Sequence, residues 1–113
     1  MLRLGFYVLR RSVMQHLFII EVKYQTSLEV VESHLANHRS FLQEWYKKGV
    51  LLASGPQNPK VGGMIIGRFE SLDKAKEFTK QDPFYTHNIA TYHFTEFDPV
   101  LHDECINNFL NHN

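Results

Sequence analysis

The chain has 113 residues, with 12 basic and 12 acidic side chains that cancel, and a single cysteine. This length predicts one domain that can bury a core without crosslinks. The balanced charge excludes the basic field that nucleic acid or anionic lipid requires, and one cysteine excludes an internal disulfide and any cysteine-rich metal site. We therefore expect a cytoplasmic protein that binds neither nucleic acid nor membrane.

Residues 1–13 form an N-terminal extension whose role the pattern leaves open. The apolar run is too short to cross a membrane, and Arg10 and Arg11 follow it, whereas a secretory signal carries its positive charge first. Met14 directly precedes the first clean strand pattern. We expect three parts: the extension 1–13, a domain over 14–98 and a helical tail over 99–113.

The spacing of apolar residues and the positions of Gly, Pro and capping residues predict seven elements. They are a strand over 15–24, a helix over 28–48, strands over 50–54 and 64–70, a helix over 72–81, a strand over 87–97 and a tail helix over 99–110. The order βαββαβ predicts an α+β, ferredoxin-like split βαβ fold, in which two helices cover one face of an antiparallel sheet.

A histidine interrupts the apolar stripe of the first predicted helix. Val31, Leu35, His38, Leu42 and Trp45 fall on one line of that helix, with charged residues opposite. Burying an imidazole is costly unless a partner takes its hydrogen bond. Judged from this helix alone, a satisfied core histidine is the commoner explanation and a catalytic one the alternative.

The predicted sheet has a second face that both helices leave uncovered. The apolar strand residues available to it are Phe18, Ile20, Val22, Met64, Ile66, Tyr92 and Phe94. An exposed patch of that size is unusual on a monomer, so we expect a homodimer in which the sheets of two copies pack face to face. The tail helix is too short to cover the sheet and is expected to embrace the partner.

Several short motifs together resemble the YciI-like (YCII-related) family over residues 14–97. They are His38, Gly49, Leu51-Leu52-Ala53-Ser54-Gly55-Pro56, Gly62-Gly63, Phe69-Glu70-Ser71-Leu72, Ala75 and Asp82-Pro83-Phe84. The resemblance implies a dimeric α+β barrel with a histidine and an aspartate in a small pocket, by position His38 and Asp82. Better understood relatives, a dehydrochlorinase of chlorinated hydroxyhydroquinone and the muconolactone isomerases, act on small cyclic or aromatic compounds without an organic cofactor.

The two residues that the resemblance indicates can meet in this fold. Both predicted helices pack on the same face of the sheet, His38 faces inward, and Asp82 ends the second helix. A carboxylate on one ring nitrogen fixes the tautomer and leaves the other nitrogen to move a proton. The structural alternative for Asp82 is a turn residue before proline.

Four further residues are candidates for contact with a substrate. Ser54 and the backbone of Gly55 could donate hydrogen bonds to a substrate oxygen, and Phe84 and Tyr85 could form an apolar wall. No metal is expected, because the i, i+4 pair of His34 with His38 lacks a third ligand.

Two functions from different classes remain open. The first is a small lyase or isomerase in which His38 is the general acid and base and Asp82 orients it. The second is a non-catalytic domain that binds a small molecule, in which His38 and Asp82 are a buried structural pair.

Overall fold

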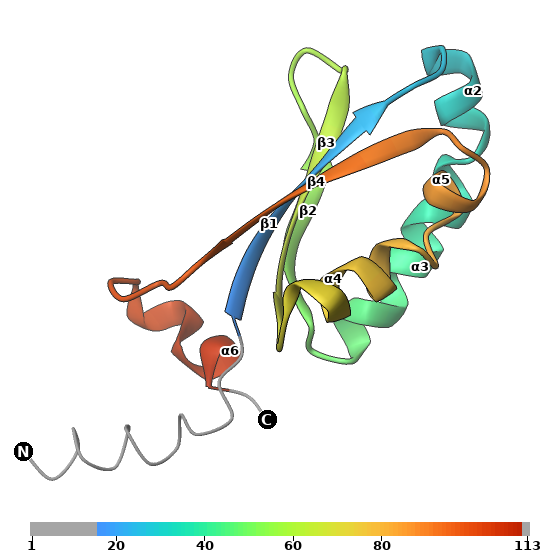
Figure 1. Cartoon of the computed structure of the whole chain (residues 1–113). Helices are drawn as coiled ribbons and strands as arrows, with labels where there is room; N and C mark the ends of the chain where they lie inside the picture. The colour runs from blue at the N-terminus through green and yellow to red at the C-terminus, as the bar shows by residue number, and fades with distance from the viewer. Residues whose placement is uncertain (1–15, 112–113) are drawn as a thin grey trace, which may run out of the picture.

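The computed structural model describes residues 16–111, which form a four-stranded antiparallel sheet with helices on one face (Figure 1). The strands are β1 (His16–Tyr24), β2 (Leu51–Pro56), β3 (Gly62–Phe69) and β4 (Ala90–Phe97), in the order β2-β3-β1-β4. The helices that cover the sheet are α2 (Leu28–Ser33), α3 (Leu35–Lys47), α4 (Leu72–Thr79) and α5 (Pro83–Thr86). This is the predicted α+β class. The extension 1–13 lies outside the described residues.

The first predicted helix is broken at His34 into α2 and α3. Ser27 caps α2 by accepting a hydrogen bond from the Val30 backbone N–H. The break has a local cause, because side chains of Ser33 and His34 both bond to the Val30 carbonyl, at 2.6 and 3.2 Å. Such bonds compete with the helical pattern of the backbone. Gly49, with φ of 75°, lies just after α3, in the left-handed conformation that commonly ends a helix.

The second predicted helix ends sooner than expected and is followed by an extra turn of helix. Ser71 caps α4 by accepting a hydrogen bond from the Lys74 backbone N–H. Beyond α4, Asp82 caps the four-residue α5, and Pro83 occupies its first turn. A backbone N–H at that position has no partner within the helix, so proline, which has no N–H, fits there. The prediction ended the second helix before Pro83, expected no helix after it and began the last strand at residue 87. In the structure β4 begins at Ala90.

The core lies between the sheet and the helices, and it contains residues that the sequence analysis assigned to the opposite face. Phe18, Ile20 and Val22 are at most 2% exposed and belong to the cluster that the helices cover, and Tyr92 and Phe94 pack against it. Their assignment to the uncovered face was wrong, because alternation alone cannot say which face of a strand is inner. Helix residues that complete the cluster are Val31, Leu42, Ala75 and Phe78.

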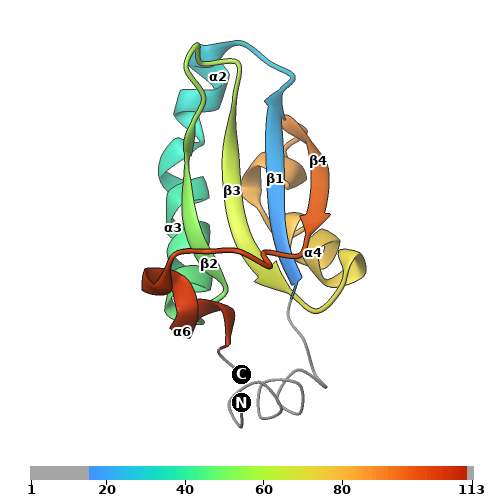
Figure 2. The same ribbon diagram turned by 90° about the vertical axis from the view of Figure 1, so that its left-hand side faces the viewer.

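The uncovered face is smaller and less apolar than predicted. It carries Ile19 and Ile66, which pair across β1 and β3, and Met64, all half-buried. In Figure 2 the segment after β4 crosses this face near the start of β1.

The tail folds onto its own sheet in short pieces. It contains a 3₁₀ turn, η2 (Glu104–Ile106), and one turn of helix, α6 (Asn107–Leu110), instead of one helix over 99–110. The ring of Phe109 lies 5.4 Å from the Arg68 guanidinium carbon, and burial lowers the pKa of Arg68. Within residues 16–111 no helix is long and apolar enough to cross a membrane.

Candidate functional site

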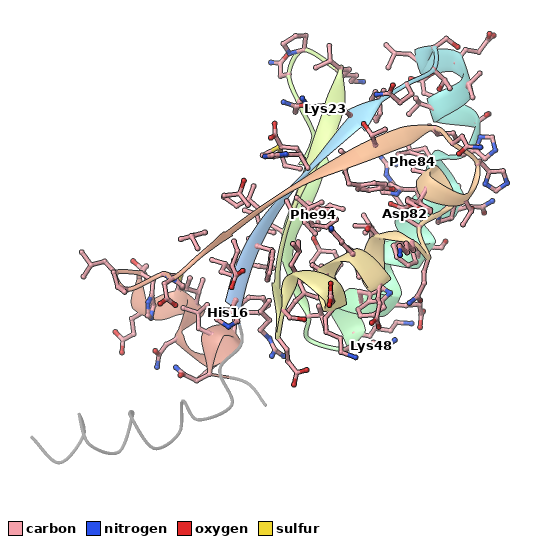
Figure 3. All side chains as sticks on the ribbon, in the orientation of Figure 1. His16, Lys23, Lys48, Asp82, Phe84 and Phe94 are labelled. Carbon is pink, nitrogen blue, oxygen red and sulfur yellow. The ribbon has the colours of Figure 1, made fainter. Side chains whose placement is uncertain are left out.

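A buried histidine–aspartate pair joins α3 to the start of α5. The Nδ1 atom of His38 lies 2.8 Å from Oδ1 of Asp82, and the two residues are 9% and 1% exposed. Because α3 and α5 cover the same face of the sheet, the structure brings together the two residues singled out in the sequence. Asp82 and Phe84 lie at the start of α5, on the side of the sheet that carries the helices (Figure 3).

The other hydrogen bonds of Asp82 fix the direction of its bond to His38. The Phe84 backbone N–H donates to Oδ1 at 3.0 Å, and the Tyr92 hydroxyl donates to Oδ2 at 2.8 Å. A carboxylate that receives donors on both oxygens acts as an acceptor only. His38 therefore donates its Nδ1–H, and the lone pair of the neutral ring lies on Nε2.

The Nε2 atom of His38 can be reached from outside. It has no hydrogen-bond partner among the described residues. Every fully buried side-chain nitrogen or oxygen atom in this part of the chain does have a hydrogen-bond partner, so an atom without one is not fully buried. Nε2 is therefore in contact with solvent, and His38 lines a cavity.

Aromatic packing holds the imidazole ring in one plane. The ring of Phe84 stacks on His38 with centroids 3.9 Å apart and an interplanar angle of 1°. Tyr24 from β1 meets the Phe84 ring edge-on at 6.1 Å. With Nδ1 bonded and one ring face covered, the orientation of Nε2 is set before any ligand arrives.

The cavity beside His38 has a volume of about 130 Å³ and lies between α2, α3, β2 and β3. An engineered apolar cavity of similar size, ~150 Å³, holds one benzene. Ser54, Gly55 and Phe84, all predicted to contact a substrate, line it. Tyr85 does not. It is 43% exposed and borders a second hollow, where its ring lies 6.1 Å from that of Tyr92. The other apolar residues that line the cavity are Val22, Leu28, Val31, Leu35, Leu42, Pro56, Met64 and Ile65.

Comparison with known proteins identifies the family. A model of the YCII-related domain matches residues 14–98. The chain belongs to the YCII-related family. This confirms the resemblance, with a boundary one residue beyond the expected 97.

A solved structure with the same fold is that of 5-chloro-2-hydroxyhydroquinone dehydrochlorinase (TftG) from Burkholderia phenoliruptrix AC1100, in complex with 2,5-dihydroxybenzoquinone. The TM-score is 0.64 and the identity 24%, over 73% of this chain and 93% of that one. A comparison with curated protein sequences gives no significant match.

In this YCII-related domain, Tyr92 is a member of the site that the sequence analysis missed. Burial first, and then the charge and hydrogen bond of Asp82, raise the pKa of the Tyr92 phenol far above its ordinary value. The hydroxyl therefore stays protonated and remains a donor to Oδ2. The strand pattern placed Tyr92 on a sheet face, but its partner depends on α5, which the sequence did not reveal.

Three charged residues at the cavity were also missed: Glu32, Arg39 and Lys60. The helical pattern placed Glu32 and Arg39 on the polar side, away from the stripe that contains His38, and they stay exposed. Long side chains at the edge of a buried stripe can still reach the rim of a cavity. The position of Glu32 and Arg39 next to residues of the stripe is the signal that could have identified these two side chains.

Ser54 is held by a neighbour on α3. The hydroxyls of Tyr46 and Ser54 lie 2.7 Å apart, and either can donate. If Tyr46 donates, the Ser54 proton is left for a ligand in the cavity.

The two histidines that were considered for metal binding contact different groups. The ring of His34 lies 4.7 Å from that of His87, just after α5, whereas His38 bonds to Asp82. Among residues 16–111, no group of three potential metal-binding side chains is found.

Proposed function

We propose that this YCII-related domain is a lyase or isomerase that moves a proton on a small cyclic or aromatic compound. One observation carries the proposal: the Nδ1 atom of His38 is bonded to Asp82, while Nε2 has no partner among the described residues and His38 lines a mostly apolar cavity of about 130 Å³. A general base needs this combination of fixed orientation and access. The similar fold of a dehydrochlorinase that binds 2,5-dihydroxybenzoquinone supports the substrate class.

The proposed reaction begins with proton abstraction from a ring carbon next to a carbonyl group. The Nε2 lone pair takes the proton, the C–H electrons move into the enolate, and the ring of His38 becomes an imidazolium. In an isomerisation, Nε2 returns the proton to another carbon. In an elimination, the electrons expel a halide ion, and the imidazolium later releases its proton to water.

Asp82 positions the base and stabilises its charged form. It fixes the Nδ1–H tautomer before reaction, and its negative charge offsets the imidazolium that forms. Ser54 and Gly55 line the same cavity from β2. In this proposal, the Ser54 hydroxyl donates to the enolate oxygen as charge develops there.

A non-catalytic binding domain is the second candidate, and one observation favours it. Asp82 bonds to His38 on α3, to the Phe84 backbone at the start of α5 and to Tyr92 on β4. A residue that joins three elements is useful to the fold whether or not any reaction occurs.

Screening the purified protein against small hydroxylated, lactone and halogenated cyclic compounds tests the proposal. The readouts are exchange of ring protons with deuterated water and release of halide. We expect exchange, isomerisation or halide release with at least one compound class. Binding with none of these reactions across the panel would favour the non-catalytic domain.

We also propose that the protein is a cytoplasmic homodimer joined through the uncovered sheet face. Ile19, Met64 and Ile66 there are half-buried and apolar, and a second copy would complete their burial. The exposed free thiol of Cys105 fits a reducing compartment. The expected embrace by the tail remains a prediction that the single chain does not test.

A further inference from the structure

Two positively charged side chains from different elements line the cavity. Arg39 lies on α3, one residue after His38, and Lys60 lies in the loop between β2 and β3. Both are exposed, whereas His38 is buried, so their charges lie nearer the mouth than the proposed base. An anionic group of a ligand would meet them as its ring enters.

Neither side chain forms an ion pair with another described residue. The ion pairs within residues 16–111 are His16–Glu96, His38–Asp82, Lys47–Glu44 and Lys74–Glu77, and none involves Arg39 or Lys60. The positive charge of Arg39 also acts on Tyr24, which lines the cavity. Burial raises the pKa of the Tyr24 phenol, and the charge of Arg39 lowers it.

One acidic side chain, Glu32 on α2, also lines the cavity and sets a limit on ligand charge. With Arg39 and Lys60 it leaves the rim with a single net positive charge. Asp82 adds no free negative charge there, because it is 1% exposed and its oxygens accept three hydrogen bonds. A second negative charge on a ligand would face Glu32 without a further cation to offset it.

We infer that the site selects small monoanionic rings, with the apolar ring in the cavity beside His38 and one oxyanion at the mouth between Arg39 and Lys60. The oxyanion is a ring carboxylate or the enolate of a cyclic diketone, which share a delocalised negative charge on oxygen. The inference rests on the proposed function for the use of the cavity and adds the charge of its substrate.

Two matched probe pairs test the inference without any reaction. Benzoate is compared with neutral benzamide, and the enolate of 1,3-cyclohexanedione with neutral 3-methoxycyclohex-2-enone. Dissociation constants come from NMR titrations that follow the amides of Gly55 and Gly63, both in the cavity wall. We expect at least one anion to bind about tenfold tighter than its neutral partner, since two surface cations contribute on this order. The arm that shows the preference identifies the oxyanion.

Charge-removing variants locate the preference. In the double variant R39Q/K60Q the ratio of the affinity for the anion to the affinity for its neutral partner should fall to about one. In the control K47Q/K48Q, which removes the same charge at the far end of α3, it should stay near the wild-type value. Equal affinities in both arms for the wild type, no binding of any probe, or an unchanged ratio in R39Q/K60Q would overturn the inference.

The failure of this inference can be told apart from failure of the proposed function. His38→Asn removes no permanent charge and should keep the probe selectivity even if it abolishes turnover. A protein that turns over neutral rings and shows no preference for anions would retain the proposed function and lose only the inferred substrate charge.

Discussion

At the scale of single residues, the proposed proton transfer depends on which nitrogen of His38 carries the proton. An asparagine places its amide N–H close to the position of Nδ1, so His38→Asn keeps a donor for Asp82 and removes Nε2. We expect it to change the free energy of unfolding by no more than about 1 kcal/mol. His38→Ala removes the donor and leaves a buried carboxylate short of a partner, at a cost of roughly 3–5 kcal/mol. Denaturant unfolding of both variants measures the difference, and a loss in His38→Asn as large as in His38→Ala would support the structural pair.

Tyr92 gives a prediction that depends on pH. Its folded pKa lies above the ordinary value of 10.0, so its contribution to stability is present below that pH and is lost as the pH rises beyond it. Tyr92→Phe removes a donor from buried Asp82 and should cost roughly 1–3 kcal/mol at neutral pH. The difference between wild type and variant should shrink above pH 10.0. Unfolding measured along a pH series checks this, and a constant or growing difference would contradict the assigned role.

At the scale of elements, the β2–β3 hairpin forms one wall of the cavity and tolerates a side chain at only some of its glycines. A Cβ at Gly62 would overlap the Val22 carbonyl oxygen of β1, which cannot move without disturbing the sheet, whereas a Cβ at Gly55 meets nothing within 4 Å. Gly62→Ala should therefore cost about 2 kcal/mol or more. The matched control Gly55→Ala should stay within about 0.5 kcal/mol of wild type. Equal thermal unfolding of the two variants would contradict the close approach.

The sequence predicted most elements because their signals are local. Ser27, Ser71 and Gly49 mark helix ends by their own chemistry, and the positions of β1 and β3 follow from alternation. The break at His34 and the short α5 were missed because both depend on side-chain hydrogen bonds to the backbone, which leave no periodic pattern.

The candidate site was predictable only in part for the same reason. His38 stood out as polar within an apolar stripe, and Asp82 entered through the family motif. Tyr85 was placed on the wrong side, because neighbouring residues on the one-turn α5 point in different directions: Phe84 stacks on His38 while Tyr85 faces Tyr92.

At the scale of the whole molecule, the proposed dimer has to cover a modest apolar face. Light scattering at low micromolar concentration should give twice the 13.3 kDa mass of the chain. Ile66→Asp, which places a charge in the middle of this face, should shift the protein toward monomer. A wild-type mass near 13.3 kDa would contradict the dimer.

The orientation of the sheet was the main error at this scale. Sequence alternation separated the two faces of each strand correctly, but the inner face is decided by contacts with Val31, Leu42 and Phe78 on distant helices. The case for a dimer therefore rests on three half-buried residues, Ile19, Met64 and Ile66, instead of the seven first considered.

The most direct test of the account is the rate of proton transfer in wild type and in His38→Asn, on a compound that the screen identifies. The readouts are deuterium exchange at the reacting carbon and halide release. Loss of a general base predicts a rate at least about 100-fold lower, with the free energy of unfolding within about 1 kcal/mol of wild type. An unchanged rate in the folded variant would contradict the claim that Nε2 of His38 moves the proton.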